Sequence, residues 1–107
     1  MRLRLLAKAE AEIAAATHWF QKTARMGTEF ARAISAGFLT IERQPKSFGP
    51  PPQLPAGERR EIRHYVVRRF KYVIVYCVLS DDEAVVVAVY HGRRKPNYWL
   101  RRLDKPF

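Results

Sequence analysis

The hydrophobic pattern of this chain changes its period once, and a run of prolines marks the change. Up to residue 43 the apolar residues recur every three or four positions, and from residue 61 onward the period is close to two. Residues 45–58 contain five prolines, which lack the N–H that a helix interior or a central strand needs. The chain is therefore restricted to a helical first part and a sheet-forming second part, joined by a stiff, partly extended connector.

Two helices are predicted before the prolines. The first carries one apolar stripe, made of Ala9, Ile13, Ala16 and Phe20. The second carries another, made of Phe30, Ile34, Phe38 and Ile41. Both have the spacing of one helix face. Thr28 is the expected N-cap of the second helix. Gly37 costs about 1 kcal/mol inside a helix and is expected to let the two helices approach closely. Because the turn between them is short, the helices should pack antiparallel.

Strand-like segments occur at residues 2–6, 62–67, 72–79 and 84–90. Short polar turns join the last three, which predicts an antiparallel meander with residues 72–79 in its centre. Pro96 is expected to open a final helical turn. The predicted fold class is α+β: an N-terminal strand, an antiparallel helical hairpin packed on an antiparallel β-meander, and a short C-terminal helix. We expect a single domain over residues 1–107.

The net charge of +10 favours an acidic partner, such as nucleic acid, an anionic membrane face or an acidic protein. No segment approaches the ~18 apolar residues of a membrane span. The apolar start is too short for a signal peptide, so we expect a soluble, cytoplasmic protein without a membrane partner. The one cysteine, Cys77, lies in an apolar run and is expected in the core. The scattered histidines form no metal-ligand spacing, so neither a metal nor a cofactor is expected.

The end of the last predicted strand carries the strongest functional signal. The strand leads directly into His91, a glycine turn, the cations Arg93, Arg94 and Lys95, and the aromatic pair Tyr98 and Trp99. A solvated tail does not need to be positioned by a rigid strand, whereas a surface that binds phosphate or a macromolecular partner does. Adjacent like charges repel one another, which also favours a bound partner at the three cations.

Two motifs in this region show a family resemblance. They are "RRFKYVIVYCV" at Arg68–Val78 and "AVYHGRRKPNYW" at Ala88–Trp99, and they follow the helical segment "AEIAAATHWFQKTARMGTEFARAI" and the proline-broken loop. In this order and spacing the chain resembles the RelE/ParE superfamily of bacterial type II toxins, over nearly its whole length. The resemblance implies the RelE-like fold and a cognate antitoxin, expected to be acidic, which forms a hetero-oligomer with the toxin.

The resemblance also bears on the target. RelE-type members cut messenger RNA in the ribosomal A site, whereas ParE-type members inhibit DNA gyrase. Val73 stands about where the nuclease members carry an arginine, and Arg63 and His64 replace their usual pair of lysines. The ParE-like branch, a non-enzymatic inhibitor of DNA gyrase, is therefore favoured. The alternative is a ribosome-dependent endoribonuclease with the ribosome and mRNA as partners. A module that only binds its antitoxin also stays open.

Candidate site residues follow from these readings. For a nuclease, the catalytic candidates are His64, His91, Arg93 and Tyr98, because RNA cleavage needs a general base, an acid and cations on the phosphorane. For binding of a target or of phosphate, the candidates are Arg63, Arg93, Arg94, Lys95 and Trp99. For binding of the antitoxin, the candidates are Arg68 and Arg69. Packing of the C-terminal turn is the competing role of Tyr98 and Trp99.

Overall fold

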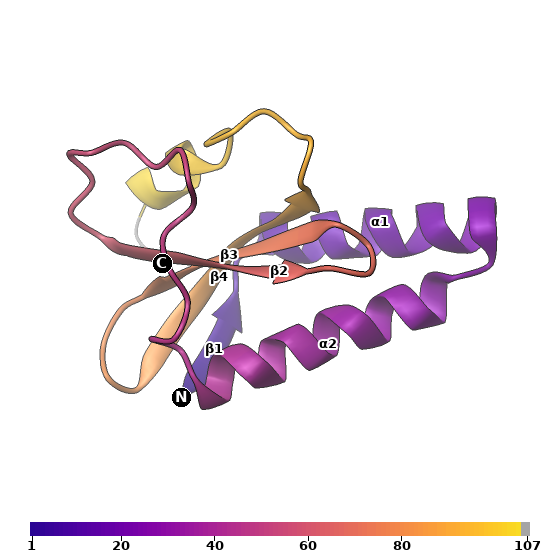
Figure 1. The fold of residues 1–107 in the computed structure, drawn as a ribbon, viewed down its shortest axis with the longest axis horizontal. Helices are drawn as coiled ribbons and strands as arrows, with labels where there is room; N and C mark the ends of the chain where they lie inside the picture. Colours follow the sequence, from indigo (N-terminus) through magenta and orange to yellow (C-terminus); the bar gives the residue numbers. More distant parts are fainter. Residues whose placement is uncertain (106–107) are drawn as a thin grey trace.

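The computed structural model describes residues 1–105. Its elements in chain order are β1 (Arg2–Leu5), α1 (Ala7–Ala24), α2 (Gly27–Arg43), β2 (Glu61–Val67), β3 (Tyr72–Val78), β4 (Glu83–His91) and a 3₁₀ turn (Leu100–Asp104). Figure 1 shows α1 and α2 as an antiparallel pair beside the sheet. The predicted α+β class and the order of the elements are confirmed.

The four strands form one sheet in the order β1-β4-β3-β2. The predicted antiparallel meander of β2, β3 and β4 is confirmed, with β3 between its two neighbours. One feature was not predicted: β1 pairs in parallel with β4, from Arg2 opposite Glu83 to Leu5 opposite Val86. This pairing gives β4 a neighbour on each side, and residues 84–89 of β4 are fully buried. Both central strands are therefore apolar on both faces.

Each face of the sheet has its own hydrophobic core. The core beneath the helices includes four stacked or edge-on aromatic rings: Phe20, Phe30, Phe70 and Tyr72. The core on the opposite face lies beneath the proline-rich loop and the C-terminal segment, with Trp99 and Leu103 as buried members. The loop and this segment replace the second helix layer that a sheet buried on both faces otherwise needs.

The helix junction differs from the sequence-based expectation. Thr28 is not the N-cap, because α2 begins one residue earlier, at Gly27. The N–H of Gly27 donates to the side-chain oxygen of Gln21 (3.1 Å), and a Cβ on Gly27 would lie 2.9 Å from the Cβ of Gln21. Glycine is therefore required here by the close approach of the two helices. The residue before the junction, Arg25, takes a left-handed backbone (φ 55°) and caps α1.

Gly37 is needed for a different contact from the predicted one. A Cβ on Gly37 would lie 2.9 Å from Cδ1 of Ile74 and 3.1 Å from Cε2 of Tyr65, both side chains of the sheet. Gly37 thus lets α2 approach the sheet and not α1.

The C-terminal helix also differs from the prediction. Pro96 lies in a preceding turn, and the 3₁₀ turn starts only at Leu100.

The first part of the segment between α2 and β2 is tied to the sheet by hydrogen bonds. The hydroxyl of Tyr76 donates to the Pro45 carbonyl (2.6 Å), and the N–H of His64 donates to the Gly49 carbonyl (3.0 Å). Near β2, the Glu58 carboxylate accepts from Nε (2.7 Å) and Nη2 (2.8 Å) of Arg60. Arg60 also donates to the Leu103 carbonyl (3.0 Å), which joins this loop to the C-terminal turn.

Gly37→Val should destabilise the fold by about 2 kcal/mol, because the added methyl groups overpack the contact with Ile74 and Tyr65. Ala36→Val is the matched control, since Ala36 is exposed on the same helix and its substitution costs only helix propensity, about 0.5 kcal/mol. Urea unfolding of both variants measures the difference. Equal losses would show that α2 does not press on the sheet at Gly37.

The Glu58–Arg60 pair predicts a dependence of stability on pH. The hydrogen bonds from Arg60 lower the pKa of Glu58 from 4.5 to about 2. The ionised carboxylate therefore stabilises the folded state fully above pH 4.5, and this contribution is lost as the pH falls towards 2. In Glu58→Gln, the melting temperature should lie below that of the wild type at neutral pH, and the gap should close over that range. A constant gap would contradict the assignment. Glu10→Gln, at an exposed position, should show no gap.

Candidate functional site

A hollow of about 250 Å³ opens on the sheet face away from the helices. We call it the sheet hollow. Its lining residues are Pro51, Pro52, Gln53, His64, Val66, Val73, Tyr90, Gly92, Arg94, Pro96 and Asn97. They come from the proline-rich loop, from all three strands of the meander and from the segment after β4. The side-chain amide of Asn97 donates to the Gln53 carbonyl (2.6 Å) and joins the two walls.

The two histidines that the sequence singled out are held in different ways. Nδ1 of His64 lies 3.0 Å from the Gly49 carbonyl, which can only accept, so Nδ1 carries the proton and Nε2 can accept one. Nδ1 of His91 instead accepts the N–H of Arg93 (3.1 Å), and its ring packs edge-on against Tyr72. His64 lines the sheet hollow whereas His91 does not. The structure therefore does not bring the two predicted proton carriers together in one site.

Arg63 points away from the sheet hollow, since it alternates with His64 along β2. Its guanidinium donates to Glu61 (2.9 Å) and to the Phe48 carbonyl (2.5 Å). The sequence grouped Arg63 with the C-terminal cations as a target or phosphate contact. The structure does not bring Arg63 together with the C-terminal cations, because these contacts hold it on the other face of β2, where it anchors the loop.

Trp99 is fully buried in the core beneath the C-terminal segment. A target cannot reach its ring in this fold, which corrects the prediction that Trp99 contacts a target and supports its packing role. The neighbouring cations Arg93, Arg94 and Lys95 are all exposed. Arg94 nevertheless has partners, because its guanidinium lies 3.6 Å from the centre of the Tyr98 ring and 3.5 Å from Glu12.

Glu12 of α1 is the centre of a polar network that the sequence did not reveal. Its carboxylate accepts hydrogen bonds from the hydroxyl of Tyr98, from two N–H groups of Arg102 (2.8 and 3.1 Å) and from the backbone N–H of Val89 (3.0 Å). Only 14% of the Glu12 side chain and 13% of the Arg102 side chain are exposed. Burial and the Glu12 carboxylate raise the pKa of Tyr98, so this hydroxyl keeps its proton and directs it at Glu12.

The network completes the edge of β4. The strand β1 pairs with β4 only as far as Val86. Beyond that point the Val89 N–H donates to Glu12, and the Val87 carbonyl accepts from Arg102 (3.0 Å). Two side chains thus satisfy the backbone groups that a longer β1 would pair, as buried polar groups require. The same side chains hold the C-terminal segment against the sheet.

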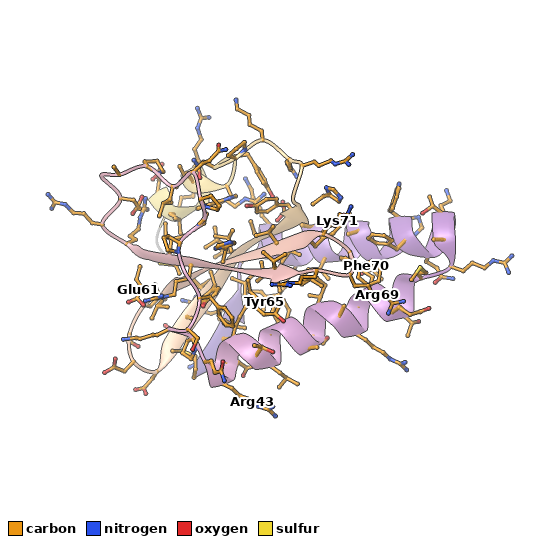
Figure 2. The ribbon with its side chains drawn as sticks, viewed as in Figure 1. Arg43, Glu61, Tyr65, Arg69, Phe70 and Lys71 are labelled. Atoms are coloured by element: carbon orange, nitrogen blue, oxygen red, sulfur yellow. The ribbon has the colours of Figure 1, made fainter. Side chains whose placement is uncertain are left out.

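Arg68 and Arg69 are exposed on the turn that joins β2 to β3. Figure 2 labels Arg69, Phe70 and Lys71 at this turn, beside the helical pair. The Arg69 guanidinium lies 5.1 Å from the centre of the Phe70 ring. Lys71 closes the turn with a left-handed backbone (φ 58°), and its carbonyl accepts the N–H of Gly92 (2.8 Å).

Within residues 1–105, no three metal-ligating side chains gather in one place. Burial raises the pKa of the Cys77 thiol, which keeps it protonated in the core. Over the same residues, neither helix combines the length and apolar character that a membrane crossing requires.

Comparison with known proteins places this fold in a family. Residues 3–96 match the family described as ParE toxin of type II toxin-antitoxin system, parDE. The chain belongs to the ParE toxin family. The matched part of this toxin contains Glu12, both histidines and the three consecutive cations, and it ends at Pro96. Tyr98 and Arg102 lie beyond the matched residues.

Among solved structures, the toxin resembles one titled "Chromosomal ParDE TA system from P. aeruginosa". The TM-score is 0.60 at 15% sequence identity, and the match covers 85% of this chain and 95% of the other. At this identity the likeness shows the fold. A search of curated proteins finds no match.

The sequence contained one signal for Glu12 that periodicity alone did not single out. Glu12 follows Ala9 by three residues and precedes Ala16 by four, so it lies on the buried face of α1. A carboxylate on a buried helix face needs a partner. Its partners lie 77 to 90 residues further along the chain. No local pattern points to contacts at that distance.

Glu12→Ala should destabilise this toxin by about 3 kcal/mol, because it leaves the buried Arg102 guanidinium without its carboxylate partner and the Val89 N–H without an acceptor. Glu12→Gln should cost less, since its amide oxygen can still accept from Val89. Thermal and urea unfolding measure both losses. Glu10→Ala, at an exposed position two residues before Glu12, should change stability by no more than about 0.5 kcal/mol. An equal effect of the two alanine variants would remove Glu12 from its central role.

Proposed function

We propose that this ParE-family toxin inhibits DNA gyrase by binding to it, and that a cognate acidic antitoxin neutralises it. The observation that carries the proposal is the composition of the sheet hollow. Its floor is apolar, with Val66 from β2 and Val73 from β3. Among its lining residues, Arg94 is the one arginine or lysine, and Glu12 and Tyr98 already engage it.

Phosphodiester cleavage makes different demands on a site. The transition state needs cations on the phosphorane oxygens, as well as a base and an acid within hydrogen-bond reach of the reacting atoms. His64 has a free Nε2 in the hollow, but Tyr98 directs its proton at Glu12, and His91 lies outside the hollow. The arrangement supports a surface that binds a protein target. The mRNA endoribonuclease stays the alternative that the experiment below tests.

The antitoxin would cover a different part of the surface. Arg68 and Arg69 are exposed at the β2–β3 turn, close to the helical pair. The helices expose two large apolar side chains, with exposed fractions of 57% for Trp19 and 52% for Leu39. An acidic, partly helical segment would suit both the cations and these apolar groups. We place the pair of proteins in the cytoplasm, where gyrase acts on the chromosome.

The test is gyrase supercoiling in the presence of purified toxin. Arg93→Ala/Arg94→Ala should abolish inhibition and leave the fold intact, because exposed ion pairs of the kind Arg94 makes contribute no more than about 1 kcal/mol. The matched control is Arg68→Ala/Arg69→Ala, which removes the same charge from the neighbouring β2–β3 turn. It should inhibit gyrase fully and bind the antitoxin more weakly.

Three results would count against this assignment. If gyrase kept its full supercoiling activity in an excess of wild-type toxin, the gyrase proposal would be refuted. Cleavage of ribosome-bound mRNA by the same preparation would favour the endoribonuclease. If the two double variants lost inhibition equally, net charge and not the C-terminal cluster would be responsible.

A further inference from the structure

A second hollow, of about 640 Å³, lies where the start of α1 meets the C-terminal segment. We call it the basic groove. Its lining residues are Leu6, Ala7, Lys8, Tyr98, Arg101, Arg102 and Lys105. Four of these seven side chains are cationic, and none is acidic. Lys8 is more than ninety residues from the three other cations in sequence, so the pairing of β1 with β4 brings the groove together.

Most cations of the basic groove are not neutralised by acidic side chains. Lys8, Arg101 and Lys105 are exposed and make no ion pair with any residue in 1–105. Arg102 is fixed by Glu12 and by the Val87 carbonyl, so its guanidinium is held in one orientation at the groove. The positive charges that line the groove repel one another, and an anion bound between them would reduce this repulsion.

The position of the groove adds to this imbalance. The first turn of α1 carries the positive end of the helix dipole, and Leu6 at its N-cap offers no side-chain acceptor. Acidic residues are favoured at such an end, yet Lys8 lies in the first turn and three cations from the C-terminal segment approach it. Glu10 is the acidic residue of this first turn, but it does not line the groove. A bound anion would balance the cations that do line it.

We propose that the basic groove binds backbone phosphates of duplex DNA. Four cations around one groove suit a polyanion better than a single carboxylate, and their number suits several neighbouring phosphates. The choice of DNA rests on the proposed function. Gyrase binds duplex DNA, so a toxin that is bound to gyrase lies near that duplex. The toxin then contacts enzyme and DNA together: the three consecutive cations face gyrase, and the basic groove faces the duplex.

Equilibrium binding of a short fluorescent DNA duplex to the purified toxin tests this, measured by anisotropy over a series of salt concentrations. The variant Lys8→Ala/Arg101→Ala/Lys105→Ala should lower affinity at least about tenfold at low salt, and the slope of log K against log salt should fall by about 3. The control is Lys22→Ala/Arg32→Ala/Arg43→Ala, which removes the same charge from exposed positions on the two helices. Its slope should fall by less than about 1. Thermal unfolding checks that both variants fold.

The outcomes separate this proposal from the gyrase assignment. DNA binding that is equally weakened in both triple variants, or unchanged in the groove variant, would overturn the phosphate site. A groove variant that binds DNA normally but no longer binds gyrase without DNA would assign the groove to an acidic protein surface, which also overturns it. Wild-type toxin that binds DNA through the groove but leaves supercoiling unaffected would support the groove and refute the gyrase proposal.

Discussion

The carboxylate of Glu12 joins three parts of the chain that are far apart in sequence. It belongs to the first helix, accepts a backbone N–H of the last strand, and binds the tyrosine and arginine that fix the C-terminal segment. The contact is needed because β1 is four residues long and β4 is nine. Beyond the end of β1, the edge of β4 that faces away from β3 has no strand partner, and an unpaired buried N–H or carbonyl is costly.

The C-terminal segment depends on this contact for its position, and both hollows depend on the segment. Arg94 forms one wall of the sheet hollow, while Arg102 forms part of the basic groove. The ring of Tyr98 lies between them, with the two guanidinium groups 3.6 and 5.1 Å from its centre. The same carboxylate thus positions cations on two different surfaces. Such rigid placement favours binding of a partner, because less side-chain freedom is lost on binding.

Periodicity in the sequence was a good guide to the elements and a poor guide to their partners. The apolar stripe of each helix and the alternation along the strands predicted every element of the α+β fold. Contacts between elements were misjudged where they depended on close approach. Gly37 faces Ile74 and Tyr65 and not the first helix, and Thr28 lies inside α2 because Gly27 allows a tighter turn. Backbone proximity of this kind leaves no trace in hydrophobic spacing.

The amino-acid sequence by itself determined the two helices, the meander, the core stripes and the membership of a toxin family, because local periodicity and motif order carry that information. The tertiary structure alone decided which side chains share a surface. It buried Trp99 and joined Lys8 to three cations at the other end of the chain. The physical reason is the parallel pairing of β1 with β4, which brings the two ends of the chain together and which no local pattern encodes.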